Sequence, residues 1–428
     1  MSGKTLFKLK KIDILIVVIL LVSSGIVLFK AGYIYQPSEE KIPPSEGREQ
    51  PQIEESTEKP LIPPTSIIPG YMRAVSPTDE GLHYDKISVC REWWYFTVVF
   101  DENSELPGWV ATVSFNHMAR GDLLGTYKPD LLVVALHGPN GEEYGGMINK
   151  ERGLGILKQP TLQAKTPGVS VTYEDSWVEG EAPEWVVHAE DNDIDLNHDL
   201  IIDLHYFAPY DPIWTIGDRS LQKTKSNLAS YVFIGCNVTG TIEIDGKTYN
   251  VHGLGFHEHS WSPNIVTRGL INGWDWSHIT LDNGWNIYYS TYYPTPQYIS
   301  TKLSKTDVFG SLILTSDQGE TLTIFDNTVS EITKSNEETF PFVAMPLGIH
   351  VIGKPGLLQP LLSTYDISLD LRINIDNTYE KIWKFPTYVG MNVGRCTIDG
   401  TITWTDENGE HKIDIEGVGT IWDMRAFI

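Results

Sequence analysis

The sequence has few cysteines and few basic residues, and both shortages exclude classes of protein. Its three cysteines, Cys90, Cys236 and Cys396, include no CxxC pair, so neither a disulfide framework nor a redox motif is indicated. Lys and Arg number 32 against 56 Asp and Glu, which gives a formal net charge of -24. Without a basic stripe, the folded part is not expected to bind nucleic acid or to adhere to anionic lipid.

Long apolar runs are also scarce, and the main one lies at the N-terminus. Four lysines precede the run from Ile14 to Phe29, a pattern typical of a signal peptide or a membrane anchor. No small-x-small cleavage site or lipobox cysteine is evident, which favours a single-pass anchor in the cell membrane, within residues 1–35, over a cleaved signal peptide. The positive-inside rule then predicts that the rest of the chain is extracellular or periplasmic.

The next segment, residues 36–70, has almost no aromatic residues and is rich in Pro and Glu. Such a composition buries too little apolar surface to offset the entropy of ordering, so it predicts a disordered linker.

A long helical period is missing after Tyr71, where the pattern is strand-like instead. The segments are short, rich in β-branched and aromatic residues, and separated by Gly, Pro, Asn and Asp, for example WWYFTVVF, WVATVSF, DLLVVALHG and LIIDLHYF. Many short strands with frequent turns predict an all-β chain of barrels or sandwiches.

An internal repeat divides this region. CNVTGTIEIDGKTYNVHGLG, beginning at Cys236, resembles CTIDGTITWTDENGEHKIDIEGVG, beginning at Cys396. Aromatic hairpins beginning at Arg91 and Asn272 also match each other, so the chain is expected to hold two copies of one fold. We place the domains at 71–262 and 263–428, and expect equivalence of Trp94 with Trp276 and of Gly240 with Gly400.

Three motifs resemble those of one family. EWWYF beginning at Glu92, HEHSW beginning at His257, and GWDW…LDNG from Gly273 to Gly284 are similar to the hydroxyneurosporene synthase or carotenoid 1,2-hydratase family, with its AttH-like relatives. The resemblance implies two tandem lipocalin-like β-barrel domains. In this chain they are expected to follow the N-terminal transmembrane helix and the disordered linker predicted above from the residues. The resemblance further implies a pocket near the domain junction for a hydrophobic, often isoprenoid, ligand. Characterised relatives add water to a carbon–carbon double bond or steer cyclisation.

The resemblance also implies site residues. The acid-His-x-Trp motif of the family maps onto Glu258, His259 and Trp261. The hydratases carry a Tyr with an Asp two residues later on the strand after the GWDW-like segment. Here Tyr288 supplies the Tyr, whereas the position of the Asp is Ser290, which puts carotenoid hydration itself in question.

The residues suit hydration of an alkene, which needs an acid, stabilisation of a carbocation and a base for water. Glu258 and Asp275 lie among aromatic residues, where desolvation would keep a carboxyl group protonated, and His259 could activate water or relay the proton. Aromatic faces attract positive charge. The aromatic residues expected to bind the ligand are Trp93, Trp94, Tyr95, Trp261, Trp274 and Trp276. No cofactor is predicted.

Strand alternation limits which of these residues share a cavity. In an extended strand His257 and His259 point to one face and Glu258 to the other. Three interpretations of HEHSW stay open: polar hydrogen bonds across the domain joint, acid–base catalysis, and a metal site on the two histidines. Because no strong spacing supplies a third ligand, we predict no metal site.

Other classes of function fit the same features. A protein that binds or carries a lipid without changing it needs only the pocket. A secreted hydrolase is a further alternative, although the sequence has no GxSxG nucleophile motif.

Overall fold

The computed structural model describes Ile62 and residues 74–427, apart from 88–89, 119–129, 150–160, 192–193, 217–228, 264–270, 295–310, 326, 337–344, 357–362 and 384–387. The predicted anchor lies outside the described residues, as does the predicted linker except for Ile62, which packs in a buried core. Within the described part, no helix is both long and apolar enough to span a membrane. The domain limits given above stay a prediction.

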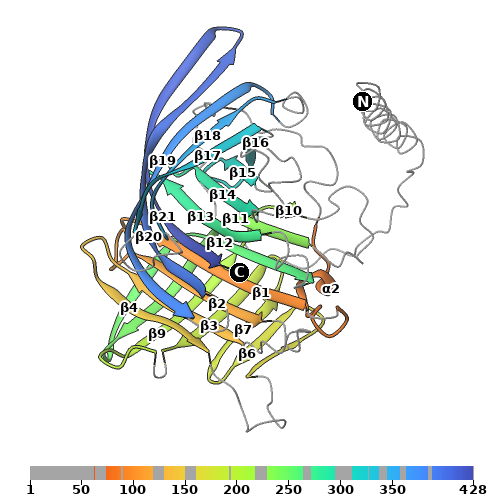
Figure 1. Cartoon of the computed structure of the whole chain (residues 1–428), viewed down its shortest axis with the longest axis vertical. Coiled ribbons are helices and arrows are strands. Elements are labelled where there is room, and N and C mark those ends of the chain that lie inside the picture. Colours follow the sequence, from red (N-terminus) through yellow and green to blue (C-terminus); the bar gives the residue numbers. More distant parts are fainter. Residues whose placement is uncertain are drawn as a thin grey trace, which may run out of the picture. The chain divides into compact units, whose positions relative to one another are not determined.

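The first sheet is 12-stranded and antiparallel, in the order β4-β3-β2-β1-β12-β11-β9-β8-β7-β6-β5, with β10 paired to β11 (Figure 1). Its strands are β1 (Cys90–Phe100), β2 (Val110–Met118), β3 (Leu131–His137), β4 (Glu143–Asn149), β5 (Leu162–Lys165), β6 (Val169–Tyr173), β7 (Ser176–Glu181), β8 (Glu184–Glu190), β9 (Leu200–Phe207), β10 (Ile213–Ile216), β11 (Ala229–Ile244) and β12 (Lys247–Pro263). A single turn of helix, α2 (Pro77–Glu80), precedes β1 and begins with a capping box at Ser76.

The second sheet is 9-stranded, in the order β16-β15-β14-β13-β21-β20-β19-β18-β17. Its strands are β13 (Ile271–Leu281), β14 (Asn286–Pro294), β15 (Ser311–Thr315), β16 (Thr321–Phe325), β17 (Asn327–Asn336), β18 (Met345–Lys354), β19 (Asp366–Trp383), β20 (Tyr388–Asp406) and β21 (Gly409–Phe427). Both sheets are strongly curled (Figure 1). The predicted all-β chain with two lipocalin-like domains is therefore confirmed.

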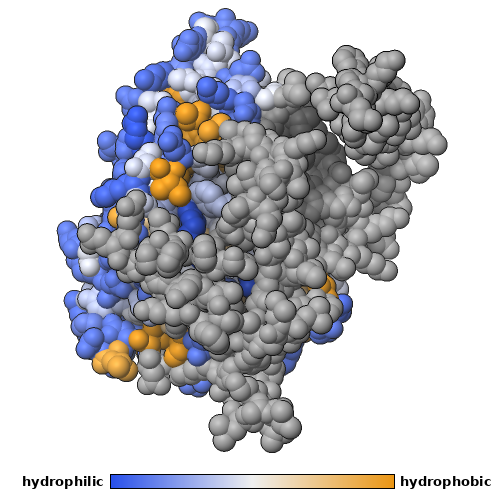
Figure 2. Space-filling model, in the orientation of Figure 1, coloured by the Kyte–Doolittle hydropathy of each residue, from blue (hydrophilic) through white to orange (hydrophobic). Residues whose placement is uncertain are grey.

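Strand alternation distributes the apolar side chains over three cores. One core lies inside the first curled sheet and one inside the second, while a third contains residues from both sheets and fills the junction between them. On β1, Trp94 and Phe96 face the first core and Tyr95 faces the junction. Each large apolar side chain that is fully buried stabilises the fold by about 1.5–3 kcal/mol. The face drawn in Figure 2 accordingly shows mainly hydrophilic side chains and small separate hydrophobic patches over the described residues.

The pairing registers confirm the internal repeat. Gly240 on β11 pairs with Leu204 of β9, and Gly400 on β20 pairs with Leu371 of β19. A Cβ added to Gly240 would lie 2.0 Å from the carbonyl oxygen of Asp203, and one added to Gly400 would lie 2.2 Å from that of Asp370. The two glycines therefore occupy the same place in the two domains, as predicted.

The predicted equivalence of Trp94 with Trp276 is wrong by one residue. Gly253 of the GLG sequence pairs with Phe100 on β1, and Gly417 of the GVG sequence pairs with Leu281 on β13. Counting back six residues from Phe100 gives Trp94, and six from Leu281 gives Asp275. Trp94 thus corresponds to Asp275, and the shift of one residue turns every side chain of the strand to the other face.

Candidate functional site

A pocket opens in the junction between the two sheets. It holds about 500 Å³ of space between atoms, open solvent at its mouth included. Most of its wall is aromatic or apolar. The lining residues are Arg91, Trp93, Tyr95, Asn116, His117, Met118, Leu131, Glu258, Trp274, Trp276, Met391 and Trp422. An apolar concave site with a few polar groups is the usual form of a site for a small hydrophobic molecule.

Equivalent positions of the two repeats both contribute side chains to this wall. In the first domain Tyr95 pairs with Glu258 across β1 and β12. In the second domain Trp276 pairs with Trp422 across β13 and β21. By the register above, Tyr95 corresponds to Trp276 and Glu258 to Trp422. The duplication therefore supplies two similar walls, but the carboxyl group occurs in only one of them.

Glu258 is buried, with 1% of its surface exposed, and hydrogen-bond donors surround its carboxyl group. Ser260 Oγ lies 3.1 Å and Ser230 Oγ 3.3 Å from Oε1, and Trp93 Nε1 lies 3.4 Å from the same oxygen. Tyr288 OH donates to Oε2 over 3.2 Å. The serines and tryptophan hold one oxygen in place, and Tyr288 holds the other.

Tyr288 connects Glu258 to the aromatic wall. Its hydroxyl oxygen accepts a hydrogen bond of 2.6 Å from Trp276 Nε1. Burial, together with the nearby charge of Glu258, raises the pKa of Tyr288 well above its usual range, so this hydroxyl group stays a proton donor at neutral pH. His278 Nε2 lies 3.7 Å from Glu258 Oε2, too far for a good hydrogen bond, and burial lowers the pKa of His278, against the effect of Glu258.

The structure brings together only part of the predicted site. Glu258 and the rings of Trp93, Tyr95, Trp274 and Trp276 line the pocket, and Tyr288 reaches it through its hydrogen bonds.

The other predicted residues do not face the pocket, because alternation turns them to the opposite faces of their strands. Trp94 and Trp261 belong to the core of the first domain, and the ring of His259 stacks on that of Trp94 in the same core. Asp275 on β13 bonds to Arg425 instead. The predicted pairing of Glu258 with His259 as acid and base in one cavity is therefore not what the fold provides.

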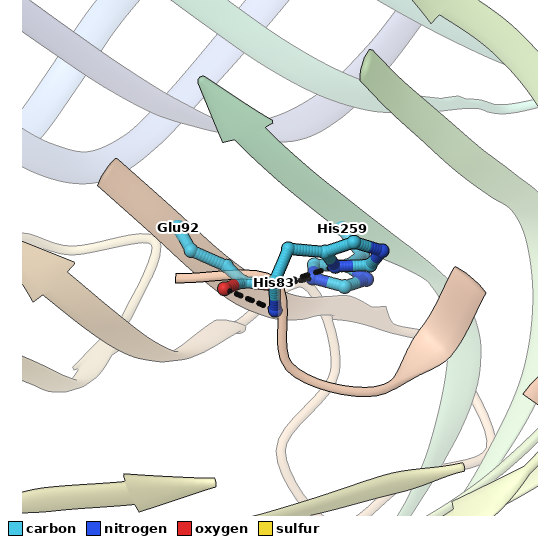
Figure 3. Close-up of side chains that lie close together, drawn as sticks. All are labelled: His83, Glu92 and His259. Atoms are coloured by element: carbon cyan, nitrogen blue, oxygen red, sulfur yellow. Dashed lines mark hydrogen bonds and ion pairs between the residues drawn. The ribbon is translucent and has the colours of Figure 1, made fainter. Parts of the chain in front are cut away.

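His259 belongs to a buried polar cluster inside the first domain (Figure 3). Its Nε2 lies 2.8 Å from Glu92 Oε1, and His83 Nδ1 lies 2.9 Å from the same oxygen. The backbone N–H groups of His83 and Tyr84 also donate to this carboxyl group. Although burial opposes ionisation, the bonds from His259 and His83 outweigh it and lower the pKa of Glu92 to about 2. His257, the other histidine weighed as a ligand, stacks on Phe96 instead.

A second buried polar cluster lies inside the second domain. Asp275 accepts a hydrogen bond of 2.6 Å from Arg425 Nη1 and another from the hydroxyl group of Tyr293. Asp423 lies directly opposite Asp275 on β21, and within the described residues neither of its carboxyl oxygens accepts a hydrogen bond from an N–H or hydroxyl donor. Burial and then repulsion from Asp275 raise the pKa of Asp423 well above its usual range, against the effect of Arg425.

The substitution Asp423→Asn is expected to stabilise the protein, and increasingly so at higher pH. When folding raises the pKa of a carboxyl group, its protonated form contributes fully to the free energy of unfolding only below the pKa in the unfolded chain. This contribution is lost as the pH rises toward the pKa in the folded protein. The free energy of unfolding of the variant should therefore exceed that of the wild type by a margin that grows, above about pH 4, by up to about 1.4 kcal/mol per pH unit.

Urea unfolding of both proteins between pH 5 and pH 8 measures this margin. Asp399→Asn is the matched control, because Asp399 is half-exposed beside Arg372. A margin that stays constant with pH would show that Asp423 is ionised in the folded protein.

The site predicted from the sequence omits several residues around the pocket, among them Ser230, Ser260, Met391 and Trp422. The position of Trp422 could have been predicted from the repeat, because aligning the GLG and GVG sequences puts Trp422 at the position of Glu258. No sequence pattern predicts Met391 as a pocket residue, because its position depends on β20 lying beside β21 at the junction.

The comparisons agree with this architecture. The family model described as AttH-like matches residues 70–323, more than half of the chain, so the protein belongs to the AttH-like family. No curated protein matches the sequence.

Among solved structures, CghA shares 12% identity over 85% of this chain and 94% of its own, with a TM-score of 0.51. An AttH protein from Nitrosomonas europaea shares 17% identity over 84% of this chain and 98% of its own, with a TM-score of 0.49. Kievitone hydratase from Nectria haematococca shares 10% sequence identity over 84% of this chain and 98% of its own, with a TM-score of 0.49. At these identities the similarity to CghA concerns the fold alone.

Proposed function

We propose that the protein binds an isoprenoid or similar lipid-like molecule in the junction pocket and adds water to one of its carbon–carbon double bonds. The observation that carries this proposal is the place of Glu258, a buried carboxyl group on the wall of a pocket lined by tryptophan rings. An acid enclosed in an apolar site can exchange a proton with a hydrophobic substrate away from bulk water. Membership of the AttH-like family, which the sequence motifs connect with hydratases, supports the same chemistry.

The chemistry needs one proton-exchanging group and a surface for positive charge. In the proposed step the carboxyl group of Glu258 transfers a proton to one alkene carbon, and the positive charge forms on the other carbon. Indole rings such as those of Trp274 and Trp276 stabilise that charge, by about 0.5–2 kcal/mol for each well-placed ring. The oxygen of a water molecule then bonds to the cationic carbon and returns a proton to Glu258, so the net reaction adds one water.

Binding without turnover is the second candidate, and Ser290 favours it. The resemblance leads us to expect an Asp at this position, whereas the Ser290 hydroxyl accepts a hydrogen bond from the backbone N–H of Ser311 over 3.1 Å. A carrier needs the pocket but not the second carboxyl group.

The place of the protein in the cell is part of the proposal. The lysine-flanked N-terminal run supports a single-pass anchor with the two domains extracellular or periplasmic. Protease added to intact or outer-membrane-permeabilised cells should release a soluble fragment that begins within residues 36–70. Recovery of the full-length chain from the cytosol would contradict this topology.

The identity and fate of the ligand test the function directly. We suggest purifying the full chain in mild detergent, identifying co-purified molecules by native mass spectrometry, and repeating this after incubation in water enriched in heavy oxygen. A bound lipid that gains the mass of one labelled water supports the hydratase. A bound lipid that stays unchanged supports the carrier, and a protein that retains no apolar molecule contradicts both.

A further inference from the structure

We propose that His83, Glu92 and His259 form a binding site for a divalent transition metal, with Zn²⁺ as the preferred ion, inside the first domain and separate from the junction pocket. The three residues come from three parts of the chain: the segment after α2, strand β1 and strand β12. Figure 3 shows the three side chains close together, with dashed lines for the interactions between them.

The ligand atoms have the spacing of a small coordination sphere. One nitrogen from each histidine and one oxygen of Glu92 all lie within 4.8 Å of one another. Both nitrogens lie 2.8–2.9 Å from the oxygen. In a tetrahedral zinc site the bonds measure about 2.0–2.2 Å, which by geometry puts neighbouring ligand atoms about 3.3 Å apart. The two N···O distances therefore differ by only a few tenths of an ångström from those expected in a zinc site.

The crowding on Glu92 Oε1 distinguishes this cluster from an ordinary hydrogen-bonded one. Two imidazole nitrogens, His83 Nδ1 and His259 Nε2, lie within 2.9 Å of this one oxygen. The oxygen also shares the backbone N–H of His83, which lies 3.0 Å from Oε1 and 2.9 Å from Oε2. If both imidazole nitrogens instead direct lone pairs at a cation, the oxygen keeps only the backbone bond and the metal.

The surroundings favour a metal as well. Tyr231 OH lies 3.2 Å from His259 Nδ1, and such a partner on the second nitrogen fixes the orientation of a ligand imidazole. The side chain of His83 is 14% exposed, whereas those of Glu92 and His259 are fully buried. Of the three side chains, His83 therefore lies nearest to solvent, and we expect an ion to enter on that side. Two nitrogens and one carboxylate oxygen suit Zn²⁺ with an open fourth position better than they suit Ca²⁺ or Mg²⁺, which prefer oxygen ligands.

The test uses the full chain in detergent, first treated with a chelator and then exposed to Zn²⁺. The expected result is about one Zn²⁺ per chain after removal of free metal, measured by mass spectrometry, with a rise in melting temperature that a chelator reverses. His83→Phe should weaken Zn²⁺ binding about 100-fold or more. Because the His83 ring stacks on Trp261 with centroids 3.8 Å apart, phenylalanine can keep the packing while it removes the nitrogen.

The matched control is His350→Phe, since His350 is a partly exposed histidine that pairs with Asp370 in the second domain. This variant should bind Zn²⁺ as the wild type does. A folded wild-type chain that retains no Zn²⁺, or a folded His83→Phe variant with unchanged affinity, would overturn the proposal and leave a hydrogen-bonded cluster. The readouts do not depend on the hydratase proposal, so either proposal can fail alone.

Discussion

Replacing Glu258 by glutamine is expected to lower the rate of water incorporation into the bound ligand by about 10²–10⁴-fold. The amide has nearly the shape of the carboxyl group but cannot exchange a proton with an alkene. Because Ser230, Ser260 and Tyr288 carry hydroxyl groups, which both donate and accept, they can adapt to the amide, so the pocket should keep its shape. The measurement is the rate of heavy-oxygen uptake by the co-purified ligand, with the amount of bound ligand determined in the same sample.

Glu331→Gln is the control for this variant, because Glu331 is an exposed residue on β17. It should leave both uptake and ligand content unchanged. If Glu258→Gln keeps the ligand and the full rate of uptake, then Glu258 is not the acid and the proposed chemistry is wrong.

Replacing Gly240 by alanine is expected to destabilise the protein by about 3 kcal/mol or more. The added methyl group would lie 2.0 Å from the Asp203 carbonyl oxygen, far inside van der Waals contact, so β9 and β11 would have to separate. Gly400→Ala should have an effect of similar size on the second domain, where the corresponding distance to the Asp370 carbonyl oxygen is 2.2 Å. Guanidinium unfolding followed by tryptophan fluorescence measures both.

Gly246→Ala separates the steric effect from the general cost of replacing glycine. Nothing lies within 4 Å of a Cβ at Gly246, although its φ of +78° is unfavourable for alanine. We expect a cost of about 1–2 kcal/mol there. Equal losses at Gly240 and Gly246 would mean that the close approach of β9 to β11 does not limit stability.

The fold could be predicted because its causes are local. Short β-branched and aromatic segments between turn residues define strands one at a time, and the match of the Cys236 and Cys396 segments reveals the duplication without any knowledge of packing. The aromatic part of the pocket could also be predicted from these strand segments. They contain Trp93, Trp274 and Trp276, which line the pocket.

The rest of the site depends on which way each side chain points. A strand such as HEHSW shows that Glu258 and His259 face opposite sides, but nothing within it tells which side is the barrel interior. The hairpins beginning at Arg91 and Asn272 align almost equally well one residue apart, and that single step exchanges Trp276 for Asp275 as the counterpart of Trp94. The contact of His259 with His83 was beyond reach because His83 lies in an irregular segment, whose position a strand pattern does not specify.

The unequal divergence of the two repeats has a stereochemical consequence. Glu258 in the first domain and Trp422 in the second occupy equivalent positions, yet only Glu258 has an acidic group that can transfer a proton to an alkene. A flat double bond held between the two walls would therefore be protonated from the face turned toward β12, while β21 would shield the other. Because the attacking water returns its proton to Glu258, it should bond from the same face. Where hydration makes the alcohol carbon a stereocentre, one mirror-image form should consequently result, with its handedness determined by which repeat kept the acid.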